Sequence, residues 1–173
     1  MIRILHTSDW HLGSELGTKT NLDTGLNLRV HDFLNAIDLV IDRAIADNVD
    51  LFLFVGDTFK NSSPSLVLQR EFVKRMKRIH DERIPFFAIS GTHDVPKVKL
   101  RTQAFELYET FSLSNVYMVS KPSVTKINTK NGMVQIVALP HLFESHHENF
   151  EQVLVSVLEQ LVKHLQPDLP SIL

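Results

Sequence analysis

The chain has 173 residues, of which 43% are hydrophobic and 22% are charged, and its formal net charge is −2. This length predicts one domain with a sizeable core, and the composition excludes a disordered chain. A net charge so close to zero gives no overall basic field, so any contact with nucleic acid requires a local basic patch.

The absence of cysteine excludes disulfides, thiol catalysis and cysteine-ligated metals. No apolar run approaches the roughly 18 residues of a membrane span, and the apolar start is too short for a signal peptide. We therefore expect a cytoplasmic protein that does not contact a membrane.

The first predicted elements are two buried strands separated by an amphipathic helix. Residues 2–8 form a short apolar strand. Residues 29–47 carry apolar side chains three and four positions apart, which is the spacing of a helix with one buried face. Residues 50–56 form a continuous apolar run that ends at glycine, as is typical of a central strand covered on both faces.

The alternation continues with a second helix, a third strand and a shorter helix. The second helix is predicted over residues 64–83, with Ser63 as its N-cap and Pro64 at its first position. Residues 84–90 form another buried strand, and residues 102–111 form the shorter helix. Alternating strands and helices predict an α/β fold whose sheet is parallel at first.

The last third of the chain has a different pattern. Short strands are predicted over residues 116–119, 123–128 and 133–139. The dipeptide Asn131-Gly132 predicts a two-residue hairpin turn between the last two strands. Residues 148–165 predict a final amphipathic helix.

Three polar turns are important because each directly follows a buried strand. They cover residues 8–13, 56–57 and 91–94. Open α/β sheets bind their ligands at the carboxyl ends of the strands. Three such turns of one parallel sheet therefore converge on one crevice.

The residues of these turns are suited to binding metal ions. Asp9 and His11 stand two residues apart, which in an extended segment points both side chains to one side. A carboxylate and an imidazole suit manganese, iron or zinc, and Asp57 adds a carboxylate that could bridge two ions. Two ions roughly 3.5–4 Å apart activate water and clamp a phosphoryl group. His93 is a candidate acid, oriented by Asp94 or by another carboxylate.

Each of these features also has a purely structural interpretation. An isolated Asp-x-His is weak support for a metal site, and a Gly-Asp after a strand is commonly only a turn. Gly-Thr-His-Asp alone could be a loop with an N-cap. The ordered combination, with every turn directly after a strand, favours the metal centre.

The three turns resemble the first three motifs of the calcineurin-like metallophosphoesterases. The matching segments are Thr7-Ser-Asp-Trp-His-Leu-Gly13, Gly56-Asp-Thr-Phe59 with Ser63-Pro-Ser65 after it, and Gly91-Thr-His-Asp94. The first segment is similar to that of the SbcD-type DNA repair nucleases. The resemblance covers essentially the whole chain and implies one domain over residues 1–173, built as a sandwich of two mixed β-sheets flanked by helices. It also implies two divalent ions, usually manganese in the nucleases, with iron and zinc as alternatives.

The resemblance implies a role for each residue of the turns. Asp9 and His11 would bind the first ion, and Asp57 would bridge both ions. His93 matches the family's catalytic histidine, which assists proton transfer to the leaving oxygen without binding metal. Asp94 follows it, as in the family's Gly-Asn-His-Asp.

Two departures from the family pattern affect the metal site. Thr92 replaces an asparagine whose carbonyl binds the second ion, and a hydroxyl is a poorer neutral ligand. The later Gly-His and Gly-His-x-His motifs, which supply three more histidine ligands, are absent. We interpret the chain as an amino-terminal portion of the domain, truncated in its second half. We expect it to bind metal weakly, to be nearly inactive, and to self-associate through exposed apolar surface.

Several other polar residues have two interpretations. The basic second helix is either a solvated face or a contact for DNA phosphates, and Lys97, Lys99 and Arg101 are better phosphate contacts because they follow the third turn. His141 lies in a segment that matches a family loop near the site, but not at a ligand position. The pair His146-His147 fits a solvated helix N-terminus better than a replacement pair of ligands.

The leading hypothesis is a metal-dependent DNA exo- or endonuclease subunit of double-strand-break repair and recombination. Its predicted partners are DNA, an SbcC-type ATPase and a second copy of itself. One alternative is a calcineurin-like phosphoesterase that acts on small phosphoesters. The other is a non-catalytic fragment that keeps a partner-binding surface.

Overall fold

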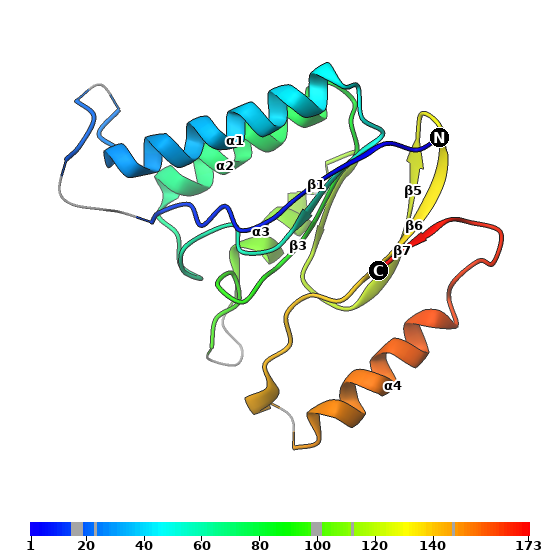
Figure 1. Cartoon of the computed structure of the whole chain (residues 1–173). Helices are drawn as coiled ribbons and strands as arrows, with labels where there is room; N and C mark the ends of the chain where they lie inside the picture. The colour runs from blue at the N-terminus through cyan, green and yellow to red at the C-terminus, as the bar shows by residue number, and fades with distance from the viewer. Residues whose placement is uncertain (15–18, 23, 98–101, 112, 147) are drawn as a thin grey trace.

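The computed structural model describes all residues except 15–18, 23, 98–101, 112 and 147. Its strands form two sheets (Figure 1). The first sheet has the strand order β1-β2-β3-β4, and all of its pairs are parallel. Its strands are β1 (Ile4–Thr7), β2 (Leu51–Val55), β3 (Phe86–Ile89) and β4 (Val116–Val119). The alternating strands and helices of the sequence thus form the predicted parallel sheet.

The second sheet is mixed. Its strand order is β5-β6-β7, with β5 antiparallel and β7 parallel to β6. Its strands are β5 (Ser123–Thr129), β6 (Gly132–Ala138) and β7 (Ser171–Ile172). The buried side chain of Gln135 in β6 donates to the carbonyl of Gln166 at 2.7 Å and accepts from its N–H at 3.0 Å. These bonds fix the segment that leads into β7.

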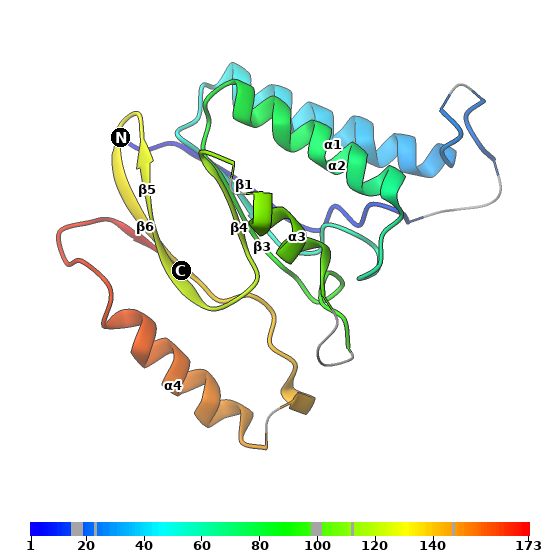
Figure 2. The same cartoon turned by 180° about the vertical axis from the view of Figure 1, so that it is seen from behind.

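The helices lie outside the two sheets. They are α1 (Leu28–Ala46), α2 (Leu66–Asp81), α3 (Ala104–Phe111), the 3-10 helix η1 (Glu144–His146) and α4 (Phe150–Val162). Helices α1 and α2 lie side by side over one face of the first sheet, and the second sheet lies against the other face (Figures 1 and 2). Helix α4 lies on the far side of the second sheet. No described helix is both long and apolar enough to cross a membrane.

The side chains of β2 alternate between two cores. Phe52 and Phe54 pack among the helices together with Trp10. Leu51 and Leu53 pack against the second sheet. Successive side chains of a strand point to opposite faces, so a strand between two layers must be apolar throughout. The continuous apolar run in the sequence is explained by this position.

The second helix begins later than predicted. Its N-cap is Ser65 rather than Ser63, because Ser65 Oγ accepts a hydrogen bond from the N–H of Leu68 at 3.4 Å. The N–H of Ser63 instead donates to Asn61 Oδ1 at 3.1 Å, in a turn before the helix. Both serines are good capping residues, and only this local turn decides between them.

The hairpin between β5 and β6 turns one residue earlier than predicted. Thr129 pairs with Gly132, which has a φ of 128° and begins β6. The two loop residues are therefore Lys130 and Asn131. The side-chain amide of Asn131 donates to Asp50 Oδ1 at 2.9 Å and so fixes the turn beside β2. This contact joins segments far apart in the sequence, so a dipeptide signal could not include it.

Candidate metal centre

The three polar turns lie at the carboxyl ends of β1, β2 and β3, and the first two are joined by backbone hydrogen bonds. The N–H of Asp9 donates to the carbonyl of Gly56 at 3.0 Å. The N–H of His11 donates to the carbonyl of Asp57 at 3.0 Å. The first turn therefore continues the parallel pairing of β1 with β2 beyond the ends of the strands.

The backbone of the first two turns differs from the extended segment expected for Asp9 and His11, and that expectation was wrong. The φ angles are 58° at Asp9, 42° at His11 and 56° at Asp57. This left-handed conformation is uncommon outside glycine and costs roughly 1–3 kcal/mol at each residue. The backbone bonds between the turns offset this cost.

The side chains of Asp9, His11 and Asp57 converge on one point. His11 Nε2 lies 3.5 Å from Asp9 Oδ1 and 3.8 Å from Asp57 Oδ2. The distance between the two carboxylate oxygens therefore cannot exceed the sum of these two distances. Both distances exceed an ordinary N–H···O bond. They are close to the separation of about 3–3.5 Å between two ligands that each lie about 2.1 Å from one ion. Two carboxylates and one imidazole therefore fit one divalent cation.

The remaining carboxylate oxygens are held by hydrogen bonds. Asp9 Oδ2 accepts from the hydroxyl of Ser8 at 2.5 Å. Asp57 Oδ1 accepts from the N–H of His93 at 2.9 Å. Each carboxylate thus keeps its other oxygen directed toward the ring of His11. The side chain of Asp57 is 17% exposed and that of Asp9 is 65% exposed. Asp57 therefore lies on the buried side of the site, and Asp9 lies on the side that faces solvent.

The ring of His93 lies next to that of His11, with a centroid distance of 4.9 Å and a right angle between the planes. Its Nδ1 lies 3.0 Å from the carbonyl oxygen of Lys60, so Nδ1–H is the donor and Nε2 is left for other chemistry. Ligand atoms of His11, Asp57 and His93 all lie within 4.8 Å of one another. Geometrically, His93 could therefore either bind an ion or transfer a proton beside it.

Asp94 holds two turns together and does not orient His93. Its carboxylate accepts from the N–H groups of Thr58 at 3.1 Å, Phe59 at 3.1 Å and Gly91 at 3.0 Å. Burial raises the pKa of Asp94, the three N–H donors lower it, and the charge of Asp57 raises it; the net direction is upward. The orienting partner of His93 is the Lys60 carbonyl, which sequence reasoning missed because a backbone carbonyl leaves no residue-type signal.

The third turn meets a loop of the second sheet at Thr92 and His141. The N–H of His141 donates to the carbonyl of Ser90 at 3.2 Å, and its Nδ1 lies 3.5 Å from Thr92 Oγ1. Burial lowers the pKa of His141, while the charge of Asp57 acts in the opposite direction. The fold therefore brings His141 to the side of the centre where Thr92 lies.

The basic residues divide into two groups. Those of α2 form ion pairs with carboxylates of α1 and α2, and these cations are Arg70, Lys74, Arg75, Lys77 and Arg78. Their pairing favours a structural role over a phosphate contact. Lys97 lines a groove of about 520 Å³ together with Thr92 and His93. Lys99 and Arg101 lie outside the described residues, as does His147.

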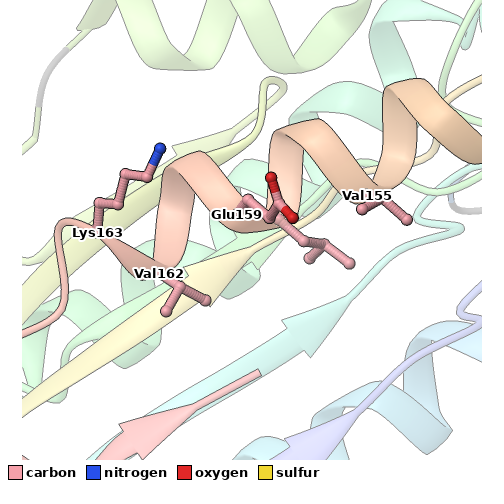
Figure 3. A pocket seen from close by; sticks show the side chains of 5 residues that line it. Val155, Glu159, Val162 and Lys163 are labelled. Atoms are coloured by element: carbon pink, nitrogen blue, oxygen red, sulfur yellow. The ribbon is translucent and has the colours of Figure 1, made fainter.

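A second groove, of about 490 Å³, lies on α4 (Figure 3). Val155, Glu159, Val162 and Lys163 line it, together with Leu158. All five belong to α4 or its C-cap, whereas the residues of the metal centre come from the loops after β1, β2, β3 and β6. This groove is therefore not part of the candidate centre.

A parallel sheet that packs against a second sheet, with carboxylates and imidazoles gathered at its strand ends, is an arrangement suited to binding divalent metal ions. The sequence matches the model of the calcineurin-like phosphoesterase family over residues 2–170, and the chain belongs to this family. The match covers the first sheet and strands β5 and β6 of the second, and it includes every residue of the candidate centre.

Curated relatives share the name DNA double-strand break repair protein Mre11. The chain is 30% identical to that of Saccharolobus solfataricus over 142 residues, which are 82% of this chain and 34% of the relative. It is 30% identical to that of Sulfurisphaera tokodaii over 152 residues, 88% of this chain and 36% of the relative. It is 34% identical to that of Methanosarcina acetivorans over 113 residues, 65% of this chain and 17% of the relative. The chain thus spans about a third of the length of the first two relatives.

Proposed function

We propose that the chain is the metal-binding part of an SbcD-type DNA nuclease that hydrolyses phosphodiester bonds in double-strand-break repair and recombination. The observation that carries this proposal is the convergence of Asp9, His11 and Asp57 on one point beside His93, in a member of the calcineurin-like phosphoesterase family. The name of the relatives supports DNA as the substrate. Residues 1–173 would belong to a single nuclease domain.

The centre would hold two divalent ions, manganese in the first place, with iron or zinc as alternatives. Asp9 and His11 would hold the first ion, Asp57 would contribute an oxygen to both, and Thr92 would contribute a weak oxygen to the second. When bound, the ions would lower the pKa of a water molecule and neutralise charge on the phosphate. We propose that the second ion binds weakly, which would leave the isolated chain with little activity.

The protein's own residues would move the proton and hold the phosphate. The Lys60 carbonyl accepts the Nδ1–H of His93, so Nε2 would deliver the proton to the leaving oxygen. We assign Asp94 a positioning role, because its hydrogen bonds go to backbone N–H groups. Lys97 would contact a substrate phosphate from the groove beside His93, and Lys99 and Arg101 are proposed to act with it.

The proposed partners are DNA, an SbcC-type ATPase and a second copy of the chain, and the proposed location is the cytoplasm. The partners follow from the resemblance of the first turn to that of the SbcD-type nucleases, and the printed name of the relatives supports DNA. With these partners, the metal centre would belong to a larger assembly in which DNA reaches the strand ends of the first sheet.

A cleavage assay tests the proposed function. Labelled single-stranded DNA and bis-p-nitrophenyl phosphate are incubated with the chain and Mn²⁺, with Asp57→Ala as the inactive control. We expect slow cleavage of DNA that depends on Mn²⁺ and is lost in Asp57→Ala. Hydrolysis of bis-p-nitrophenyl phosphate without DNA cleavage would instead support a phosphoesterase of small substrates. Metal binding without any hydrolysis would support a non-catalytic, partner-binding fragment.

A further inference from the structure

We infer that His141 is a further ligand of the metal centre and donates an imidazole nitrogen to the ion on the side of Thr92. This inference rests on the proposed function, because it assumes that the centre binds divalent ions. It concerns a residue outside the three strand-end turns, in the loop that leaves β6 of the second sheet.

A backbone hydrogen bond fixes the position of His141. Its N–H donates to the carbonyl of Ser90, the residue directly before Gly91 and Thr92. A loop of the second sheet is thereby attached to the third turn of the first sheet. The ring of Phe143 packs at a right angle on the imidazole, at 4.5 Å between centroids, and restricts its orientation.

The imidazole of His141 shows the same bonding pattern as that of His11. In each ring one nitrogen is buried and has no hydrogen-bond partner among the described residues, namely Nδ1 of His11 and Nε2 of His141. The other nitrogen lies 3.5 Å from an oxygen, of Asp9 for His11 and of Thr92 for His141. This distance is long for a hydrogen bond and suits two ligands of one ion.

His93 provides the contrast. Its Nδ1 has a normal hydrogen bond of 3.0 Å to the Lys60 carbonyl, as expected for a histidine that is oriented for proton transfer. A cation between His141, Thr92 and Asp57 would bind Nδ1 of His141, the nitrogen that faces Thr92, and would add a nitrogen where the threonine hydroxyl is a weak ligand.

Metal binding by the purified chain tests the inference without relying on turnover. Mn²⁺ alone is titrated by calorimetry, and Co²⁺ alone is followed by its visible absorption, which reports the ligand set. His141→Ala is expected to lower the affinity of the weaker site by about tenfold or more, since even outer partners of ligands cost about 10–100-fold. The exposed His164→Ala is the matched control and is expected to bind as the wild type does.

Two further variants separate ligation from a structural role. His141→Asp keeps a metal-binding group and is expected to recover part of the affinity lost in His141→Ala. This difference in affinity is expected even where both variants are less stable than the wild type. In a Thr92→Asn background, whose amide oxygen is a better ligand, the loss caused by His141→Ala is expected to be smaller.

Equal affinity and an unchanged Co²⁺ spectrum in His141→Ala, together with lost binding in Asp57→Ala, would overturn the inference and leave the proposed function intact. A wild-type chain that binds neither ion would overturn both.

Discussion

A β-carbon at Gly91 would lie 2.3 Å from both the backbone nitrogen and the Oδ1 atom of Asp57. The turns after β2 and β3 therefore approach each other at a distance that only glycine permits. Gly56 belongs to the same contact, because a β-carbon there would lie 2.8 Å from the Cα of Gly91. The two glycines set the position of the carboxylate that we propose to bridge the ions.

Gly91→Ala should therefore displace Asp57. Real β-carbons do not approach backbone atoms at 2.3 Å, so the turn has to move. A displacement of about 1 Å commonly costs about 100-fold in activity. We expect a comparable loss of Mn²⁺-dependent cleavage and weaker Mn²⁺ binding by calorimetry.

The matched control is Gly25→Ala. Among the described residues other than its two chain neighbours, none has an atom within 4 Å of a β-carbon at Gly25, although its φ of +70° is unfavourable for alanine. We expect a loss of stability of about 1–2 kcal/mol from this strain and unchanged metal binding. Unchanged Mn²⁺ binding in Gly91→Ala as well would contradict the close approach of the two turns.

His93→Ala should lose turnover and keep its metal. The proposed proton transfer from Nε2 contributes about 10²–10⁴-fold to the rate, whereas the first ion keeps Asp9, His11 and Asp57. Rates and Mn²⁺ affinity are measured on the same preparation, beside Asp57→Ala. If His93→Ala loses Mn²⁺ as completely as Asp57→Ala does, His93 is a ligand instead, which the 4.8 Å cluster of His11, Asp57 and His93 also permits.

Asp94→Ala should destabilise the fold and disturb the centre together. The carboxylate accepts three backbone N–H bonds, from Thr58, Phe59 and Gly91, and truncation leaves these donors buried. We expect a loss of about 2–4 kcal/mol in urea denaturation, because buried unpaired donors are costly. Asp81→Ala, which removes an exposed ion pair, should cost at most about 1 kcal/mol. Equal losses in the two variants would show that Asp94 does not join the turns.

The stability contributed by Glu71 should depend on pH. Burial raises the pKa of Glu71, but hydrogen bonds from neighbouring cations outweigh it, so the pKa lies below its ordinary value of 4.5. These cations are Lys74, Arg70 and Arg75. A lowered folded-state pKa means that the stabilisation is complete above 4.5 and is lost as the pH falls through the folded-state value.

We therefore expect Glu71→Gln to lower the free energy of unfolding by about 1–3 kcal/mol at pH 7 and by much less near pH 3. Denaturation of both proteins at the two pH values measures this difference. A constant difference between pH 7 and pH 3 would show that the charge of Glu71 makes no contribution.

Much of the fold could be predicted because its signals are local. A run such as residues 51–55, apolar at every position, has to be a strand between two layers, and the structure places it there. The polar turns follow β1, β2 and β3, so their convergence required only that these strands be adjacent and parallel. The sequence could not decide between Ser65 and Ser63 as the N-cap, because both are serines that favour the start of a helix.

The sequence by itself determined which side chains gather at the strand ends, because strand order and turn position suffice for that. Only the tertiary structure decided how they are held. The left-handed φ of Asp9 and His11 depends on backbone bonds to the turn after β2. The orientation of His93 depends on the Lys60 carbonyl, and the arrival of His141 depends on a loop of the other sheet. Such contacts join residues that are distant along the chain, so they cannot be predicted from residue types alone.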